Sequence, residues 1–144
     1  MHYLDNAATT KPSKAACDAA MNAMTKDFSN PSSLYRLGID AENIISQARS
    51  TIASAIGCEA SGLYFTSCAT ESSNTVIFGA AENYGKRKKK AVTTAVEHPS
   101  VSQAFDKLEK MGFEVVRIFP DENGKISAGQ ITEAVDENTF LVSC

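Results

Sequence analysis

Short apolar runs that alternate with helical segments constrain the fold of this chain more than any other feature. The runs 63–66, 91–96, 114–119 and 140–144 are short and rich in aromatic or β-branched residues, as buried strands are. Between them, apolar residues recur every three or four positions, which is the spacing of amphipathic helices. Strands separated by helices predict βαβ units. The sequence therefore predicts an α/β fold with a partial, mainly parallel sheet and flanking helices.

Local signals indicate where the helices begin and end. Ser13 is an expected N-cap for a helix that ends before Asn30-Pro31, and Pro99 suits the first turn of the helix after 91–96. A longer helix follows Gly38, and Gly57 stands where a left-handed terminating residue is expected. One face of that helix carries the apolar residues Ala41, Ile44, Ile45, Ala48, Ile52 and Ile56.

Composition excludes several classes of protein. With 43% hydrophobic and 22% charged residues, the chain matches an ordinary soluble globular protein and not a disordered tail, a fibre or a coiled coil. No apolar run approaches the roughly 20 residues of a membrane span, and no export signal is visible, so we expect no membrane partner and a cytoplasmic location. A formal net charge of −3 argues against general nucleic-acid binding.

The cysteines and histidines do not predict a metal site or a disulfide framework. Cys17, Cys58, Cys68 and Cys144 show no C-x-x-C spacing, and only two histidines are present. We therefore expect no bound metal, and we expect most of the thiols to be packing residues.

The segment Ser67–Thr70 is a candidate anion site. It lies between the predicted strand 63–66 and the start of a helix, where ligands bind in parallel α/β sheets. Backbone N–H groups of a first helical turn, with the hydroxyls of Ser67 and Thr70, suit a phosphate group. The alternative is that Ser67 or Thr70 only caps the helix, with Glu71 in its first turn.

His98 is the second candidate site residue, because it directly follows the predicted strand 91–96. It would lie at the same edge of the sheet as the anion site, where an imidazole could stack on a planar ligand or move protons. The alternative is a histidine that only forms structural hydrogen bonds. A phosphate site and a histidine at neighbouring strand ends together predict a planar, phosphorylated ligand.

The basic run Lys86–Lys90 also invites an anion-binding interpretation. The run precedes the strand that His98 follows, so it would lie at the opposite edge of the sheet, about 20 Å away at roughly 3.3 Å per residue. We therefore expect a solvated loop, whose lysines could not reach a ligand beside His98.

Four segments, taken together, resemble motifs of a known family. They are Tyr3–Thr10, Asn30–Ser33, Tyr64–Ser72 and Val96–Val101. In this order and spacing they resemble motifs of the cysteine desulfurases, which belong to the class V aminotransferases and are pyridoxal-phosphate enzymes of fold type I. The resemblance extends over essentially the whole chain.

The resemblance implies roles for individual residues. Pyridoxal 5'-phosphate is the implied cofactor, with Ala69 and Thr70 at the positions that hold its phosphate. His98 matches the catalytic histidine that stacks on the pyridine ring and assists proton transfers. The residues implied to lie near the substrate are Asn6, Ala7 and Asn30.

The resemblance also implies an activity and partners. The parent reaction converts cysteine to alanine and leaves an enzyme persulfide, which supplies sulfur for iron–sulfur clusters or thio-cofactors. The small-molecule substrate is cysteine, the full-length parent is a homodimer, and a sulfur-acceptor protein is a further partner. Residues 1–144 would form a single incomplete domain: an N-terminal extension over 1–30 and the first part of the cofactor-binding α/β domain.

The chain departs from the family pattern in sequence and in length. Cys68 stands where glycine is usual and could crowd the phosphate loop, and Ser73 stands where asparagine is common. Family members are more than twice as long, and the cofactor-binding lysine, the aspartate that pairs with the pyridine nitrogen and the catalytic cysteine are absent. The chain stops inside an apolar run, so we interpret it as the N-terminal part of a longer enzyme, inactive alone and prone to associate through an exposed sheet edge.

Three alternatives remain open. The parent could be a selenocysteine lyase or another class V transaminase. The chain could instead be a non-catalytic interaction module that pairs with a full-length homologue. It could also be an unrelated α/β phosphate-binding domain, which the four-motif resemblance disfavours.

Overall fold

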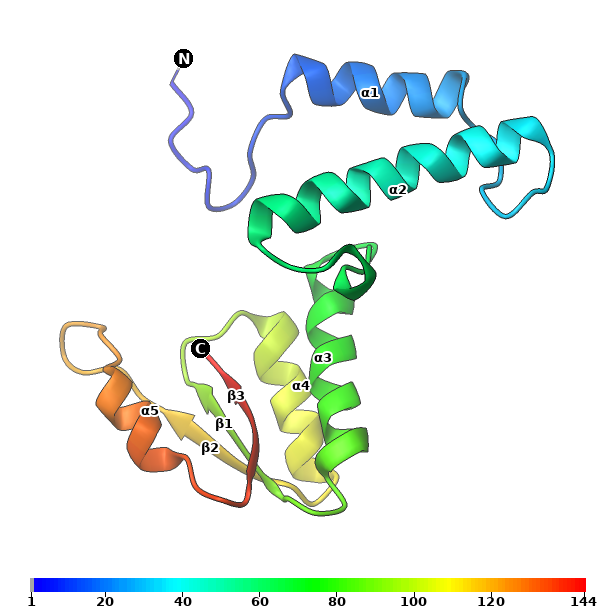
Figure 1. Cartoon of the computed structure of the whole chain (residues 1–144). Helices are drawn as coiled ribbons and strands as arrows, with labels where there is room; N and C mark the ends of the chain where they lie inside the picture. The colour runs from blue at the N-terminus through cyan, green and yellow to red at the C-terminus, as the bar shows by residue number, and fades with distance from the viewer. Residues whose placement is uncertain (1) are drawn as a thin grey trace. The chain divides into compact units, whose positions relative to one another are not determined.

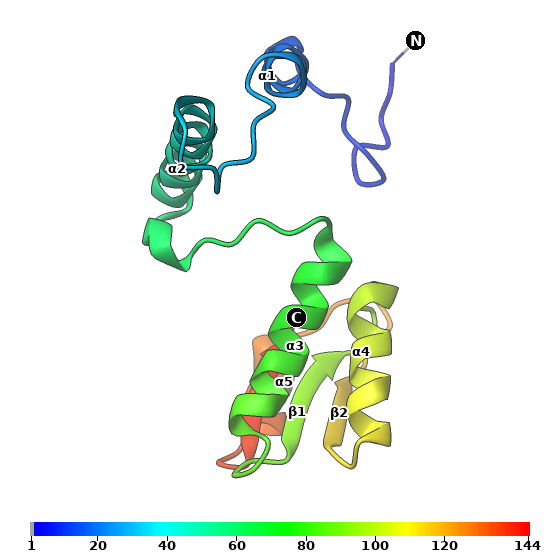
Figure 2. The same cartoon turned by 90° about the vertical axis from the view of Figure 1, so that its right-hand side faces the viewer.

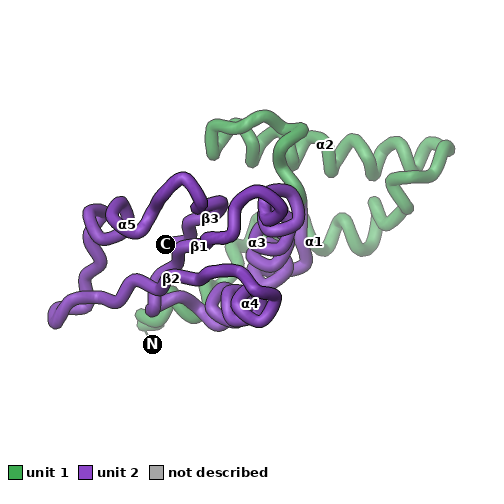
Figure 3. Tube along the Cα trace, turned by 90° about the horizontal axis from the view of Figure 1, so that it is seen from below, with its two compact units in different colours: residues 1–64 green, residues 65–144 purple. Residues whose placement is uncertain are grey.

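The computed structural model describes residues 2–144, which divide into two compact units at residues 64 and 65. Figure 3 colours the two units separately. The first unit contains the helices α1 (Lys14–Thr25) and α2 (Arg36–Ile56) and the short 3-10 helix η1 (Ala60–Gly62). The second contains α3 (Ala69–Tyr84), β1 (Lys90–Thr94), α4 (Pro99–Lys110), β2 (Glu114–Ile118), α5 (Ala128–Ala134) and β3 (Thr139–Ser143). The division into an N-terminal extension over residues 1–30 and the first part of an α/β domain, within one incomplete domain, stays a prediction.

The helix ends of the first unit follow the local signals in the sequence. Ser13 caps α1, because its Oγ accepts a hydrogen bond from the backbone N–H of Ala16 at 3.2 Å. Gly57 ends α2 with a φ of 75°, in the left-handed region that glycine adopts without strain. The helix begins at Arg36, slightly earlier than expected.

The apolar face of α2 is only partly covered in the described chain. Ala41 and Ala53 are buried, whereas Ile44, Ile52 and Ile56 are 45%, 41% and 64% exposed. The first unit therefore presents a row of isoleucines to solvent, although a face of this kind normally packs on another element.

The second unit is built on a three-stranded sheet with the order β2-β1-β3, and all its strands are parallel. Helices α3 and α4 lie side by side on one face of the sheet (Figures 1 and 2). Helix α5 lies on the other side of the strands, next to β2 (Figure 3). This is the predicted α/β fold with a parallel sheet and flanking helices, and it places the helix N-termini near the carboxyl ends of the strands.

The core of the second unit lies between α3, α4 and the sheet. Phe105 and Leu108 of α4 are fully buried and contact Ile77 of α3 and Ala91 of β1. The central strand β1 is buried on both faces, since residues 91–94 are all buried. This explains why its sequence reads as a continuous buried run and not as an alternating pattern.

One predicted strand is wrong. In the described residues, sheet pairing involves only β1, β2 and β3, and the run 63–66 is irregular chain. Its aromatic side chains are largely exposed, Tyr64 by 81% and Phe65 by 52%. An apolar run supplies the side chains of a buried strand, but a strand also requires a hydrogen-bonded neighbour, and no described strand lies beside this run.

Candidate functional site

The two candidate segments come together at the N-terminal ends of α3 and α4. Thr70 and Asn74 of α3 line a cavity of about 280 Å³ together with Pro99 and Ser100 of α4. His98 immediately precedes this part of α4, where it is the N-cap residue. The first turns of α3 and α4 therefore border a common hollow, but His98 and residues 67–69 are not among the described residues that line it. Whether these residues bind a ligand stays a prediction.

Backbone donors that no helical carbonyl accepts lie at the start of α3. The first hydrogen bond of the helix runs from the N–H of Ser72 to the carbonyl oxygen of Cys68 at 3.2 Å. The N–H groups of Ala69, Thr70 and Glu71 precede this bond and have no acceptor within the helix. The N–H of Ala69 lies at the positive end of this 16-residue helix, next to the N–H groups of Thr70 and Glu71 and the Thr70 hydroxyl, which also interact with the Cys68 thiol. Together these groups form a donor set that fits a phosphate group.

Cys68 does not strain the turn. Its φ of −167° and ψ of 169° are ordinary extended backbone, and no non-glycine residue from 2 to 144 has a positive φ. A side chain is therefore tolerated at this position, where the family that the sequence resembles usually has glycine.

The side chain of Glu71 braces this turn. Its Oε2 accepts the backbone N–H of Ser67 at 2.6 Å and the hydroxyl of Ser67, also at 2.6 Å. These two bonds hold the pKa of Glu71 below its usual value, the hydroxyl having the larger effect. The expected alternative, a cap formed by Ser67 or Thr70, is therefore wrong: Cys68 occupies the N-cap position, and no side chain caps the helix.

The thiols are placed differently from the prediction. All four cysteines are exposed, so the expectation that most are packing residues is wrong within the described chain. The Cys68 side chain forms no capping hydrogen bond. Nearby donors nevertheless lower the pKa of its thiol: the N–H of Glu71 has the largest effect, followed by the Ser67 hydroxyl, which lies 3.7 Å from the sulfur.

His98 has a structural role that leaves one ring nitrogen available. Its Nδ1 accepts the backbone N–H of Ser100 at 3.1 Å and lies 2.9 Å from the Ser100 hydroxyl. Because Nδ1 is an acceptor, the neutral ring carries its proton on Nε2. The structural alternative is thus confirmed, and Nε2 remains for contact with a ligand.

The turn that carries His98 is fixed by a second side-chain bond. The hydroxyl of Thr94, at the end of β1, donates to Oε1 of Glu97 at 3.2 Å. Thr94 is buried, so this bond ties the irregular residues between β1 and α4 to the sheet.

The predicted substrate-proximal residues lie in the first unit, so the structure does not join them to the hollow between α3 and α4. The backbone oxygen of Asn6 lies 3.4 Å from the Thr10 hydroxyl, and Ala7 belongs to the same turn. Asn30 shapes its own loop, because its Oδ1 accepts the N–H of Ser32 at 2.9 Å. Their roles near a substrate stay predictions.

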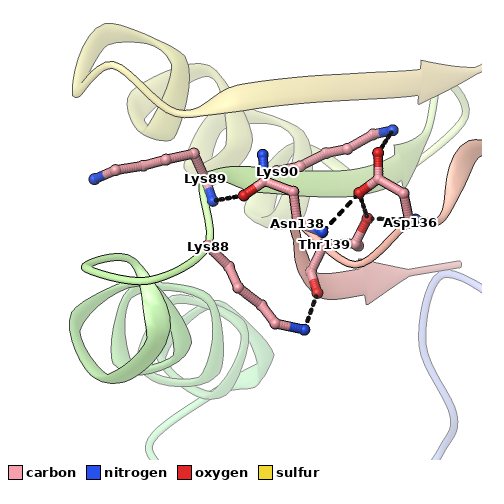
Figure 4. A network of polar contacts seen from close by, with 6 residues as sticks. All are labelled: Lys88, Lys89, Lys90, Asp136, Asn138 and Thr139. Atoms are coloured by element: carbon pink, nitrogen blue, oxygen red, sulfur yellow. Dashed lines mark hydrogen bonds and ion pairs between the residues drawn. The ribbon is translucent and has the colours of Figure 1, made fainter.

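The basic run is less solvated than expected. Polar contacts join it to the turn before β3: Lys88 Nζ to Thr139 O at 3.1 Å, Lys89 N to Asn138 Oδ1 at 2.9 Å, and Lys90 Nζ to Asp136 Oδ2 at 3.0 Å (Figure 4). The Lys90 side chain is only 12% exposed, and its bond to Asp136 is the main cause that lowers the pKa of that carboxyl. The expectation of a solvated loop holds for Lys86 and Arg87 but is wrong for Lys90.

The position of the basic run agrees with the prediction. Lys90 begins β1, and His98 follows its end, so the run and the hollow lie at opposite ends of the strand. The lysines of the run serve the sheet and the turn before β3, and not the hollow.

No group of three or more histidine, cysteine, aspartate or glutamate side chains among residues 2–144 could hold a metal ion. None of the described helices is both long enough and apolar enough to cross a membrane.

Comparison with known proteins identifies the family. A model of the family described as aminotransferase class-V matches residues 2–144. A NifS/IcsS protein homolog of Lactobacillus delbrueckii subsp. bulgaricus is 40% identical over 99% of this chain, and the cysteine desulfurase IscS of Methanosarcina thermophila is 38% identical over 98%. This chain spans 37% and 35% of the length of these two relatives.

A solved structure supports the same assignment. The structure described as SspA in complex with cysteine superimposes with a TM-score of 0.91 at 36% identity, over 99% of this chain and 41% of its own chain. The cysteine desulfurases of this family are pyridoxal-phosphate-dependent enzymes. The agreement of sequence, fold and strand-end geometry leads to one conclusion: the chain belongs to the class V aminotransferase family.

Proposed function

We propose that this chain forms the phosphate- and ring-binding part of a pyridoxal-phosphate-dependent cysteine desulfurase. The observation that carries the proposal is the hollow lined by Thr70 of α3 and by Ser100 next to His98. A phosphate site at the start of α3 and an imidazole at the N-cap of the neighbouring α4 would match the two ends of a phosphorylated aromatic cofactor.

The first turn of α3 would hold the cofactor phosphate. The N–H groups of Ala69 and Thr70 lie before the first helical hydrogen bond, and the Thr70 hydroxyl adds a side-chain donor. Together with the positive end of the helix dipole, these donors suit a phosphate dianion and need no lysine.

His98 would contact the aromatic ring of the cofactor. Since Nδ1 is engaged by the N–H of Ser100, the ring orientation is fixed by the start of α4. Nε2 is then the atom through which His98 donates or accepts a proton during catalysis. When bound, pyridoxal phosphate supplies an electron sink for reactions at the α-carbon of an amino acid.

The substrate and partners proposed for the whole enzyme follow from its relatives. Cysteine is the proposed substrate, supported by relatives named cysteine desulfurase and by the related protein whose structure is described as a complex with cysteine. We propose that Asn6, Ala7 and Asn30 lie near this substrate, and that a homodimeric, cytoplasmic enzyme passes persulfide sulfur to an acceptor protein for iron–sulfur clusters or thio-cofactors.

The 144 residues alone would bind the cofactor without turning over cysteine. The lysine and the catalytic cysteine that the family requires have no counterpart among these residues, and the remaining lysines of the basic run lie at the other end of β1. Half of a catalytic site can hold a phosphate group but cannot complete proton relay and sulfur transfer.

The test compares binding with turnover. We expect the absorbance of pyridoxal phosphate to change on titration with the chain, and pyridoxal without phosphate to bind more weakly. Release of alanine and sulfide from cysteine should equal the background of free cofactor, and borohydride should label no unique lysine. Absence of phosphate-dependent binding would refute the site, and turnover above background would refute the claim that the chain is inactive alone.

A further inference from the structure

The turn Ser67–Thr70 is held in place by the first turn of α3 itself. In the described chain the residues that lead into it, 63–66, belong to no strand, so sheet pairing does not fix the turn. Its position depends instead on side-chain bonds from Glu71 and Ser72.

Two pairs of residues form these bonds. The Glu71 carboxylate accepts both the N–H and the hydroxyl of Ser67 at 2.6 Å. The Thr66 and Ser72 hydroxyls lie 2.6 Å apart, and the Thr66 hydroxyl also donates to the backbone oxygen of Cys68 at 3.2 Å. Of these bonds, only those to Glu71 are charge-assisted, which makes them the stronger restraint.

We propose that Glu71 is a positioning residue for the cofactor phosphate and that it acts through Ser67; this proposal rests on the proposed function. By holding Ser67, the carboxylate fixes the chain on the N-terminal side of Ala69 and Thr70. The N–H groups of these two residues then meet a phosphate in a preorganised geometry, so binding does not have to order the turn.

The negative charge of Glu71 has an opposing effect. A carboxylate near a phosphate repels it, so a mutation that removes the charge strengthens binding if repulsion dominates. At an exposed position, water and salt strongly screen this repulsion. Glu71 is exposed, and its charge faces two donors of Ser67, so we expect the restraint to outweigh the repulsion.

Two substitutions in the full 144-residue chain separate these effects. Glu71→Ala removes both the charge and the acceptor, whereas Glu71→Gln removes the charge but keeps an oxygen that can accept from Ser67. Glu82→Ala is the matched control, because Glu82 is exposed near the other end of the same helix. The dissociation constants of pyridoxal phosphate and of pyridoxal are measured for each protein, together with hydrogen exchange at the Ser67 amide.

For Glu71→Ala we expect about tenfold weaker binding of pyridoxal phosphate, as for the loss of one hydrogen bond to a charged group. Binding of pyridoxal should be unchanged, and the Ser67 amide should exchange faster. Glu71→Gln should bind close to wild type, and Glu82→Ala should match wild type in every measurement.

Three results would overturn the proposal for Glu71: tighter binding by both Glu71 variants, unchanged binding by Glu71→Ala, or equal loss of pyridoxal phosphate and pyridoxal. A wild-type chain that does not distinguish pyridoxal phosphate from pyridoxal would instead overturn the proposed function, and with it the role assigned to Glu71.

Discussion

Substitution of His98 separates its structural role from its proposed role in binding. His98→Ala removes both the ring and the acceptor that caps α4, whereas His98→Asn removes the ring but restores a side chain that is among the best N-caps. The comparison is informative because Nδ1 accepts the Ser100 N–H at 3.1 Å, which is the bond that asparagine can replace.

The size of each effect follows from that geometry. Loss of an N-cap to alanine costs about 1 kcal/mol, which lowers the melting temperature by about 4–8 °C in a domain the size of the second unit. Loss of an aromatic contact costs about 0.5–1.5 kcal/mol, a weakening of cofactor binding by roughly two- to tenfold.

We therefore expect the two variants to agree in binding and to differ in stability. Both should bind pyridoxal phosphate more weakly than wild type, whereas only His98→Ala should melt earlier by circular dichroism. If His98→Asn binds the cofactor as tightly as wild type, the ring does not contact it. If the two variants melt together, the cap does not stabilise α4 and the tautomer argument fails.

Three further predictions concern stability and association. Because the pKa of Asp136 is lowered, the ionised carboxylate stabilises the fold at pH above its usual value of 3.8, and this stabilisation is lost as the pH falls below that value. Asp136→Asn should therefore flatten the pH dependence of the free energy of urea unfolding in that range. An unchanged pH dependence would exclude the Lys90–Asp136 bond as the source of this stabilisation. Gly38→Ala should destabilise the first unit by about 1–3 kcal/mol, because a Cβ there would clash with the backbone oxygen of Ser33. An unchanged thermal melt would contradict this clash. The exposed isoleucines of α2 should make the chain self-associate, and a strictly monomeric, cooperative melt in analytical ultracentrifugation and calorimetry would count against this.

The elements of the second unit were predictable because their signals are local. The apolar runs around β1, β2 and β3 are flanked by helices with regular spacing, and Pro99 marks the start of α4 by its backbone preference. Each boundary lies within a few residues of the expected position.

The wrong predictions share a physical cause, which is that burial depends on neighbours and not on composition. The run 63–66 has the side chains of a strand, but no strand lies beside it in the described chain. The cysteines likewise lie on surfaces that the described chain leaves uncovered.

That α3 and α4 begin next to each other was predictable, but the bonds at these helix starts were not. Strand order and helix starts were enough to bring Thr70 and Ser100 to one hollow. The capping role of His98 and the brace from Glu71 were not foreseen, although the four-residue spacing between Ser67 and Glu71 was a usable signal.

An NMR titration of the chain with pyridoxal phosphate tests the shared hollow most directly. We predict that the backbone amides of Ala69 and Thr70 and the ring of His98 shift along one saturation curve, while the amides of the basic run Lys86–Lys90 do not move. Shifts confined to the lysines, or a His98 ring that does not respond while Thr70 does, would contradict a single ligand held between α3 and α4.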